Sequence, residues 1–142
     1  MIVLLDSLLE RLVHGWEVRT PQHLSEILEA METVLANFGC EEQEWNRIRI
    51  ALDEAITNGC KHGNGWNPEK KVLVTVLHCS LQDFQVRIVD EGLGFDPEDV
   101  PDPREIENLE RPCGRGLLLM RHYMNVKFEP PGNSVILSRK EP

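Results

Sequence analysis

Residues 70–90 have the sequence KKVLVTVLHCSLQDFQVRIVD, and this stretch decides the predicted fold. Its first part, residues 70–79, is rich in the β-branched residues that favour strands. Its last part, residues 84–90, alternates apolar and polar side chains, which is typical of a strand with one buried face. The polar residues 80–83 between them are typical of a turn. The stretch therefore predicts two antiparallel strands joined as a hairpin.

Two helices are expected before this hairpin. Residues 23–39 repeat apolar side chains at helical spacing, with Pro21 suited to the first turn and Gly39 to the stop. A second helix is expected over residues 42–62, where the chain then breaks on Gly-Asn-Gly. A short strand candidate, residues 15–20, precedes both helices.

A long segment without clear periodicity follows the hairpin. Residues 91–116 are rich in glycine, proline and acidic side chains, and a loop of this length in a compact domain is usually functional. A helix is expected over residues 116–124, and residues 125–130 and 133–139 form a closing hairpin. This order predicts an α+β two-layer sandwich, a mostly antiparallel mixed sheet of about five strands with about three main helices on one face and a long lid loop.

The length and composition predict one soluble domain over residues 1–142. Residues 1–15 form an N-terminal extension that is either an amphipathic helix or a strand. Asp6 interrupts its apolar run and no basic segment precedes it, so we expect no signal peptide, no membrane contact and a cytoplasmic location. The net charge of −9 argues against direct binding of nucleic acid.

The four cysteines lie far apart and form no CxxC pair, which argues against a zinc site and a thioredoxin-like motif. They are expected to be buried free thiols in a reducing compartment. They are Cys40, Cys60, Cys79 and Cys113.

The predicted helix over residues 42–62 carries a line of polar groups beside its core stripe. Glu54, Asn58 and His62 are spaced by four, so they stack along one line of the helix. The core stripe itself consists of Ile48, Leu52, Ala55, Ile56 and Gly59. An ordinary polar flank would explain the line, but Asn58 stands between two further poor helix formers. A metal, a ligand or a close-packed neighbour would each account for it.

The segment DEGLGFDP, residues 90–97, directly follows a predicted strand. Asp90 stands at the carboxyl end of that strand, and Gly92 and Gly94 permit tight turns and close approach of a ligand. Taken alone, this pattern is equally typical of an acidic surface turn.

The segment CGRGLLLMRHYM, residues 113–124, places two glycines where a helix begins. Gly114 and Gly116 leave backbone amides open to an anion, and Arg115 adds a positive charge. The spacing is neither that of a Walker A motif nor that of a dinucleotide-binding GxGxxG. A flexible hinge before an ordinary helix is an equally good interpretation of this segment alone.

Together, three segments resemble the Bergerat-fold ATP-binding family of histidine kinases, type II topoisomerases, heat-shock chaperones and mismatch-repair ATPases. More narrowly, the chain resembles the anti-sigma factor serine kinases. EAITNGCKHGN is similar to their N-box, VDEGLGFDP to their first glycine box, and ENLERPCGRGLLLMRHYM to their lid and second glycine box. The resemblance covers residues 16–140, and Gly59 departs from it because many relatives carry alanine there.

The resemblance implies roles for the residues of the N-box. Asn58 is similar to the ligand of a Mg²⁺ ion that bridges the nucleotide phosphates. Glu54 is similar to the general base that accepts the proton of an attacking serine hydroxyl. Lys61 is similar to a basic residue that meets a phosphate in some relatives, although a solvent-facing lysine is the simpler interpretation. His62 would only support the helix end or the lid.

The resemblance also implies roles for the two glycine segments. Asp90 is similar to the carboxylate that binds the exocyclic amine of adenine, and Gly92 and Gly94 would let the base and ribose approach. The lid glycines and their arginine would face the phosphates of ATP; they are Gly114, Arg115 and Gly116.

The implied function is that of an ATP- and Mg²⁺-dependent protein-serine kinase and anti-sigma factor. Its partners would be a sigma factor and an anti-anti-sigma antagonist, and relatives also form homodimers. The alternative is a nucleotide-gated partner-binding module without phosphate transfer. Vestigial boxes on a structural protein are a further alternative. The detached ATPase domain of a histidine kinase is disfavoured, because no dimerising helical pair with a phosphoacceptor histidine precedes the domain.

Overall fold

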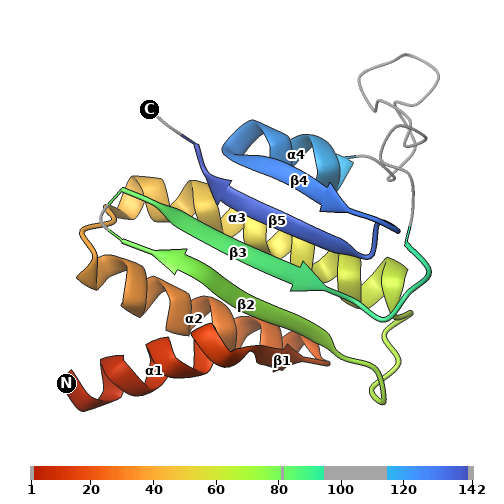
Figure 1. Ribbon diagram of the computed structural model, residues 1–142, viewed down its shortest axis with the longest axis horizontal. Coiled ribbons are helices and arrows are strands. Elements are labelled where there is room, and N and C mark those ends of the chain that lie inside the picture. The colour runs from red at the N-terminus through yellow and green to blue at the C-terminus, as the bar shows by residue number, and fades with distance from the viewer. Residues whose placement is uncertain (1, 81, 95–114, 141–142) are drawn as a thin grey trace.

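The computed structural model describes residues 2–80, 82–94 and 115–140. Within these residues, one sheet lies against a layer of helices (Figure 1). The helices are α1 (Ile2–His14), α2 (Pro21–Asn37), α3 (Glu42–Asn58) and α4 (Arg115–Tyr123), and a π-helical turn, Gly59–Gly63, continues α3. The strands are β1 (Trp16–Val18), β2 (Val72–Cys79), β3 (Phe84–Val89), β4 (Met124–Glu129) and β5 (Ser134–Arg139).

The sheet has the order β1-β2-β3-β5-β4, and every strand pair in the described residues is antiparallel. The predicted hairpin is confirmed as β2 and β3, in which Val74 pairs with Ile88 and Val76 with Val86. The predicted closing hairpin is confirmed as β4 and β5. The α+β class predicted from the element order is therefore confirmed, while the predicted lid falls largely outside the described residues.

The core lies between the sheet and the helices, because each element turns one apolar face inward. The alternation predicted for β3 is confirmed, since every second side chain of the strand is buried. The predicted helical stripes are also buried; they are Leu24, Ile27, Leu28, Met31, Val34 and Leu35 on α2, and Ile48, Leu52, Ala55 and Ile56 on α3.

Local signals account for the start and end of α2. The Thr20 hydroxyl caps the helix by accepting a hydrogen bond from the His23 N–H at 3.2 Å, and Pro21 takes the first helical position. Past the end of the helix, Gly39 adopts a φ of 88°, a left-handed conformation that glycine tolerates best. The boundaries expected from the sequence are thus close to those observed.

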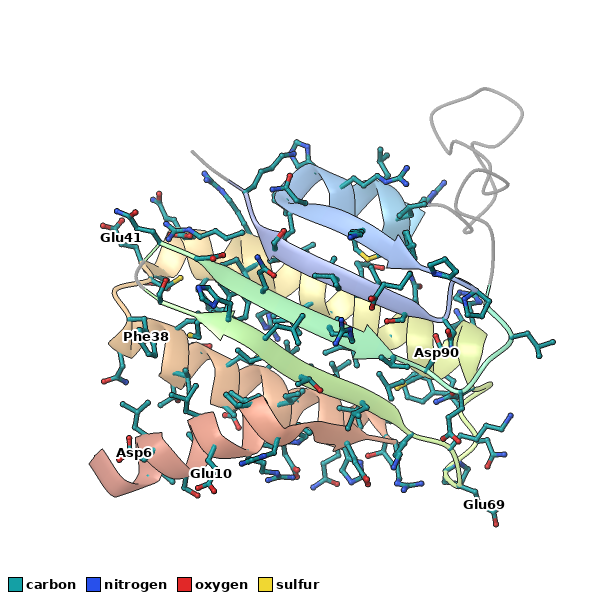
Figure 2. The ribbon with its side chains drawn as sticks, viewed as in Figure 1. Asp6, Glu10, Phe38, Glu41, Glu69 and Asp90 are labelled. Atoms are coloured by element: carbon teal, nitrogen blue, oxygen red, sulfur yellow. The ribbon has the colours of Figure 1, made fainter. Side chains whose placement is uncertain are left out.

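The N-terminal extension is a helix, which decides between its two interpretations. β1 pairs only with the first three residues of β2, and α1, which leads into the start of β1, packs beside the rest of β2 (Figure 1). Asp6 and Glu10 lie on the exposed side of α1 (Figure 2), while Leu12 is 1% exposed and belongs to the core. The helix therefore covers an edge that would otherwise be open to another strand. None of the described helices is long and apolar enough to cross a membrane.

Shortening Leu12 to alanine should lower the free energy of unfolding by about 2–5 kcal/mol, because it leaves a cavity where α1 meets the sheet. Urea denaturation of the Leu12→Ala variant measures this loss. Leu4→Ala is the matched control on the same helix, since Leu4 is 60% exposed. The control should change stability by less than about 0.5 kcal/mol. Equal losses in the two variants would contradict the packing of α1 described above.

The cysteines agree only in part with the expectation of buried thiols. Cys60 is buried, and its burial together with the nearby Asp90 carboxylate raises the pKa of its thiol to about 11. Cys40 and Cys79 are free but only half-buried, because Cys40 lies in the connection between α2 and α3 and Cys79 is the last residue of β2. Cys113 lies outside the described residues.

Candidate functional site

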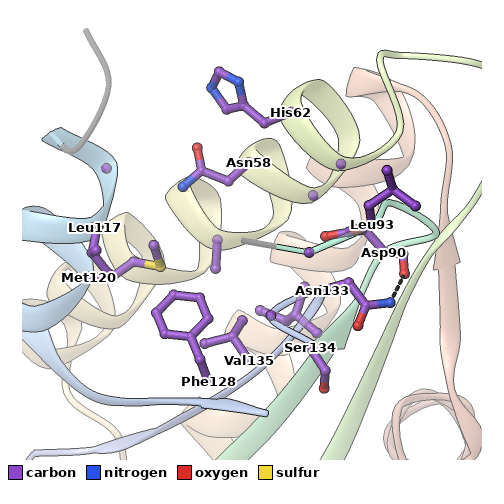
Figure 3. Close-up of a pocket in the computed structure, with 17 residues that line it drawn as sticks. Asn58, His62, Asp90, Leu93, Leu117, Met120, Phe128, Asn133, Ser134 and Val135 are labelled. Carbon is purple, nitrogen blue, oxygen red and sulfur yellow. Dashed lines mark hydrogen bonds between the residues drawn. The ribbon is translucent and has the colours of Figure 1, made fainter. Parts of the chain in front are cut away.

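A cavity of about 510 Å³ lies between α3, the π-helical turn, the end of β3, the closing hairpin and α4 (Figure 3). One wall is apolar and comes from five elements, α3, β3, α4, β4 and β5. It consists of Ala55, Ile88, Leu117, Met120, Phe128 and Val135. The polar side chains that line the cavity are Asn58, His62, Asp90, Asn133 and Ser134. Such a shape, apolar with a few convergent polar groups, is typical of a small-molecule site.

The end of α3 brings Asn58 to the cavity and Glu54 close beside it. Both side chains are half-buried, because they border the core stripe instead of opposing it. The start of α4 packs directly on them, since a β-carbon added to Gly116 would lie 2.7 Å from Glu54 Oε2 and 3.1 Å from Asn58 Nδ2. Glycine at position 116 is therefore what lets α4 approach these two groups.

The poor helix formers around Asn58 coincide with a change of helix type. Thr57 donates a hydrogen bond from its hydroxyl to Asp53 Oδ1 at 3.1 Å, and the π-helical turn begins at Gly59. A β-carbon at Gly59 would lie 3.0 Å from Val72 Cγ2 and 3.4 Å from Asp90 Cβ. The glycine that departs from the family pattern thus lets the helix end lie close to β2 and Asp90. Single π-helical turns are frequent at functional sites.

Asp90 lies at the end of β3, where its carboxylate faces the π-helical turn. Its N–H donates to Asn133 O at 2.9 Å, and its Oδ1 accepts from the Gly92 N–H at 2.7 Å. A side chain at Gly63 would occupy the space that the Asp90 carboxyl group fills. Burial raises the pKa of Asp90, and the hydrogen bond from Gly92 opposes this only in part.

Glu54 is the other carboxylate with a shifted pKa near the cavity. Burial raises its pKa, and the nearby negative charge of Asp53 adds to the shift. A carboxylate whose pKa is raised is a better proton acceptor at neutral pH than an exposed one. Glu54 therefore combines a raised pKa with a position beside Gly116 and the cavity.

The structure brings together only some of the residues expected at the site. Four of them line the cavity, namely Asn58, Asp90, Gly94 and Gly116, and Glu54 lies beside Gly116.

The other expected residues lie elsewhere. Lys61 is exposed and does not line the cavity, in keeping with its simpler interpretation as a solvent-facing side chain, and His62 is exposed but does line it. Arg115 begins α4 and is exposed without lining the cavity. Gly114 lies outside the described residues.

Gly92 and Gly94 meet protein backbone at close range. A β-carbon at Gly92 would lie 2.7 Å from Gly63 O, and one at Gly94 would collide with the carbonyl of Pro131. Gly94 also has a φ of 85°, which disfavours other residues. Both glycines therefore let the segment after β3 lie close to other parts of the backbone, at Gly63 and at Pro131. Their close approach to a ligand stays a prediction.

The sequence patterns do not predict that two asparagines near the cavity bind the Asp90 segment. Asn133 donates from Nδ2 to Asp90 O at 3.0 Å, and Asn64 accepts at Oδ1 from the Glu91 N–H at 2.8 Å (the Asn133 bond is drawn in Figure 3). Asn64 is the one buried polar side chain among the described residues. The Gly-Asn-Gly sequence indicates only that the helix ends, and the burial of Asn64 depends on its contacts with Lys71 and Glu91, far along the chain.

The donor set around Asn58 suits a metal that needs few protein ligands. In the part of the chain that the structure describes, no group of three or more His, Cys, Asp or Glu side chains could hold an ion. A single amide oxygen fits Mg²⁺, which commonly takes one or two protein ligands and fills its shell with phosphate oxygens and water.

A family model described as the histidine kinase-like ATPase domain matches residues 18–139, so α1 lies outside the match. The anti-sigma F factor of Oceanobacillus iheyensis is 28% identical over 107 residues, which cover 68% of this chain and 70% of that protein. The anti-sigma F factor of Halalkalibacterium halodurans is 28% identical over 106 residues, covering 68% and 69%. That of Bacillus cytotoxicus is 32% identical over 88 residues, covering 58% of each chain.

Proposed function

The chain belongs to the histidine kinase-like ATPase domain family, and from that premise we propose that it is a Mg·ATP-dependent protein-serine kinase that also sequesters a sigma factor. The observation that carries the proposal is the convergence of Asn58 and Asp90 on one mostly apolar cavity, with Glu54 beside it. The similarity to anti-sigma F factors supports the regulatory part of the proposal.

The adenine base would lie at the Asp90 end of the cavity. The carboxylate of Asp90 accepts a hydrogen bond from the exocyclic amine, and the apolar wall packs against the faces of the ring. Phe128 and Met120 belong to that wall, so the base exchanges water for apolar contact. Guanine carries a carbonyl oxygen where adenine carries the amine, so an ionised Asp90 disfavours it.

The phosphates would lie toward Asn58 and the start of α4. The Asn58 amide oxygen is the group that would hold Mg²⁺, which when bound neutralises phosphate charge. The backbone amides that begin α4 favour a negative charge. Gly116 lets the start of α4 lie against Glu54 and Asn58, because a larger residue there would collide with Glu54.

Glu54 would act as the general base of the transfer. The serine hydroxyl oxygen forms a bond to the terminal phosphorus, the bond from that phosphorus to ADP breaks, and the hydroxyl proton passes to the Glu54 carboxylate. Burial raises the pKa of Glu54, which makes the carboxylate a stronger proton acceptor. ADP and a phosphoserine are the products.

The proposed partners are a sigma factor and an antagonist protein that carries the accepting serine, as the similarity to anti-sigma F factors suggests. We also propose that residues 1–142 form a single domain that works in the cytoplasm and pairs as a homodimer. The net charge of −9 suits protein partners better than nucleic acid.

A second candidate is a module whose partner binding depends on nucleotide without any phosphate transfer. The contact of Gly116 with Glu54 and Asn58 favours it, since a phosphate bound there would touch the start of α4 directly. The two candidates differ in their products and not in their ligand.

The test uses the antagonist-like or sigma-factor proteins encoded beside the gene, each incubated with the purified chain and radiolabelled ATP. The proposed kinase should place label on a serine of one of them. Retention of a partner that depends on ATP, with no label in any neighbour, would reject the kinase and support the second candidate. Partner binding that does not depend on nucleotide would reject both candidate functions.

A further inference from the structure

We propose that Asn64 is a positioning residue that sets the direction of the Asp90 carboxylate and thereby the selectivity for adenine. This proposal rests on the proposed function, because it assigns a role in reading the base that the cavity would hold. It concerns a residue that does not line the cavity and would not touch the nucleotide.

The peptide group between Asp90 and Glu91 is hydrogen-bonded through both its carbonyl oxygen and its N–H. Its carbonyl oxygen accepts a hydrogen bond from Asn133 Nδ2 at 3.0 Å, and its N–H donates to Asn64 Oδ1 at 2.8 Å. The N–H of Asp90 is bound as well, to Asn133 O at 2.9 Å. The backbone on both sides of the Asp90 α-carbon is therefore fixed, and Asn64 provides the only described bond to the far N–H of this peptide group.

Asn64 is itself held in place by the start of β2. Its Nδ2 donates to Lys71 O at 2.9 Å, and the Lys71 N–H donates to Glu91 Oε2 at 2.6 Å. A closed ring of hydrogen bonds thus joins Asn64, Lys71 and Glu91. The asparagine is 6% exposed, so removal of its side chain would leave two part-buried backbone groups without these partners.

The π-helical turn is what brings Asn64 to this position. The Asn64 N–H donates to Gly59 O at 2.9 Å, which is the five-residue spacing of a π-helix. Continued α-helical spacing would pair this N–H with the carbonyl of Cys60 and rotate the side chain by about 100°. The same turn carries Gly63 against the Asp90 carboxyl group, so one local feature supports both the backbone and the side chain of Asp90.

This arrangement matters for selectivity because a hydrogen bond is sensitive to direction. Rotation of the peptide group after Asp90 would displace the Gly92 N–H, which donates to Asp90 Oδ1 at 2.7 Å. The carboxylate would then be free to turn away from the place where an amine could donate to it. Binding energy from the apolar wall and the phosphates would remain. Loss of Asn64 should therefore weaken discrimination at the amine more than it weakens nucleotide binding in general.

The test compares two ligands that differ only in that amine. Calorimetry measures the affinities of ADP and of purine riboside diphosphate, which lacks the exocyclic amine, for the full chain. Wild type should prefer ADP, and Asn64→Ala should reduce this preference roughly fivefold, as expected for one hydrogen bond of about 1 kcal/mol. Asn64→Ser, whose shorter hydroxyl cannot span to the Glu91 N–H, should reduce it similarly and replaces the alanine variant if that variant does not fold.

The matched control is Asn67→Ala in the same turn. Asn67 caps the exposed Glu69 N–H at 3.0 Å and has no described bond to the Asp90 segment. It should leave the preference for ADP unchanged. In an Asp90→Asn background, Asn64→Ala should cause no further loss of preference, because the group it positions has already been changed.

Equal weakening of both ligands by Asn64→Ala, with the preference for ADP intact, would overturn the positioning role while leaving the proposed function in place. Failure of wild type to bind ADP at all would instead reject the proposed function together with this inference.

Discussion

The Glu54→Gln variant is expected to transfer phosphate to a partner serine about a hundred to ten thousand times more slowly than wild type, the range for loss of a general base. Glutamine keeps the size of the side chain and its contact with Gly116 but cannot accept the hydroxyl proton. Affinity for Mg·ATP should change by less than about threefold, since the lost group acts on the serine and not on the nucleotide.

The measurement is a single-turnover assay with radiolabelled ATP and the phosphate-accepting partner. Asp53→Asn is the matched control, because it removes the neighbouring carboxylate of the same helical turn. Asp53 accepts a hydrogen bond from Thr57 and lies away from the cavity, so its variant should keep most of the rate. A Glu54→Gln rate equal to that of wild type would show that Glu54 is not the base.

The Asp90→Asn variant should bind ATP about 10 to 100 times more weakly. Asparagine has one acceptor oxygen where the carboxylate has two, and its NH2 group is a donor that cannot pair with the exocyclic amine of adenine. The same variant should be more stable than wild type at neutral pH. Burial raises the pKa of Asp90 in the folded state, so wild type loses stability as the pH rises from the ordinary aspartate pKa through the folded-state pKa, and the full cost is present above it.

Calorimetry and urea denaturation measure these two effects on the same preparation. The stability gain should shrink as the pH falls below the pKa of folded Asp90 and disappear only below the ordinary aspartate pKa, where the folded and unfolded states of wild type are both protonated. Lower ATP affinity together with higher stability distinguishes this result from a general loss of structure, which would lower both quantities. Undiminished affinity of Asp90→Asn for ATP would place the base elsewhere in the cavity.

Much of the fold followed from local patterns. The alternation of residues 84–90 and the helical stripes of α2 and α3 depend on neighbours within a few residues, and each was confirmed by burial. The N-terminal extension was ambiguous because thirteen mostly apolar residues suit either a helix or a strand, and only its packing beside β2 decides between them.

The candidate site was predictable only where its chemistry lies in single residues. Asn58 and Asp90 were expected to face one ligand, and the structure places both on one cavity. The role of Asn64 depends on hydrogen bonds to Lys71 and Glu91, which are 7 and 27 residues away. Such contacts form only in the assembled fold, so no local sequence pattern predicts them.

Calorimetric titration of the wild-type chain with Mg·ATP tests the central claim most directly. We expect saturable binding at one site per chain, competed by ADP and weakened strongly in Asp90→Asn. Absence of binding up to millimolar Mg·ATP would contradict the account, and the cavity would then be a structural remnant of its family.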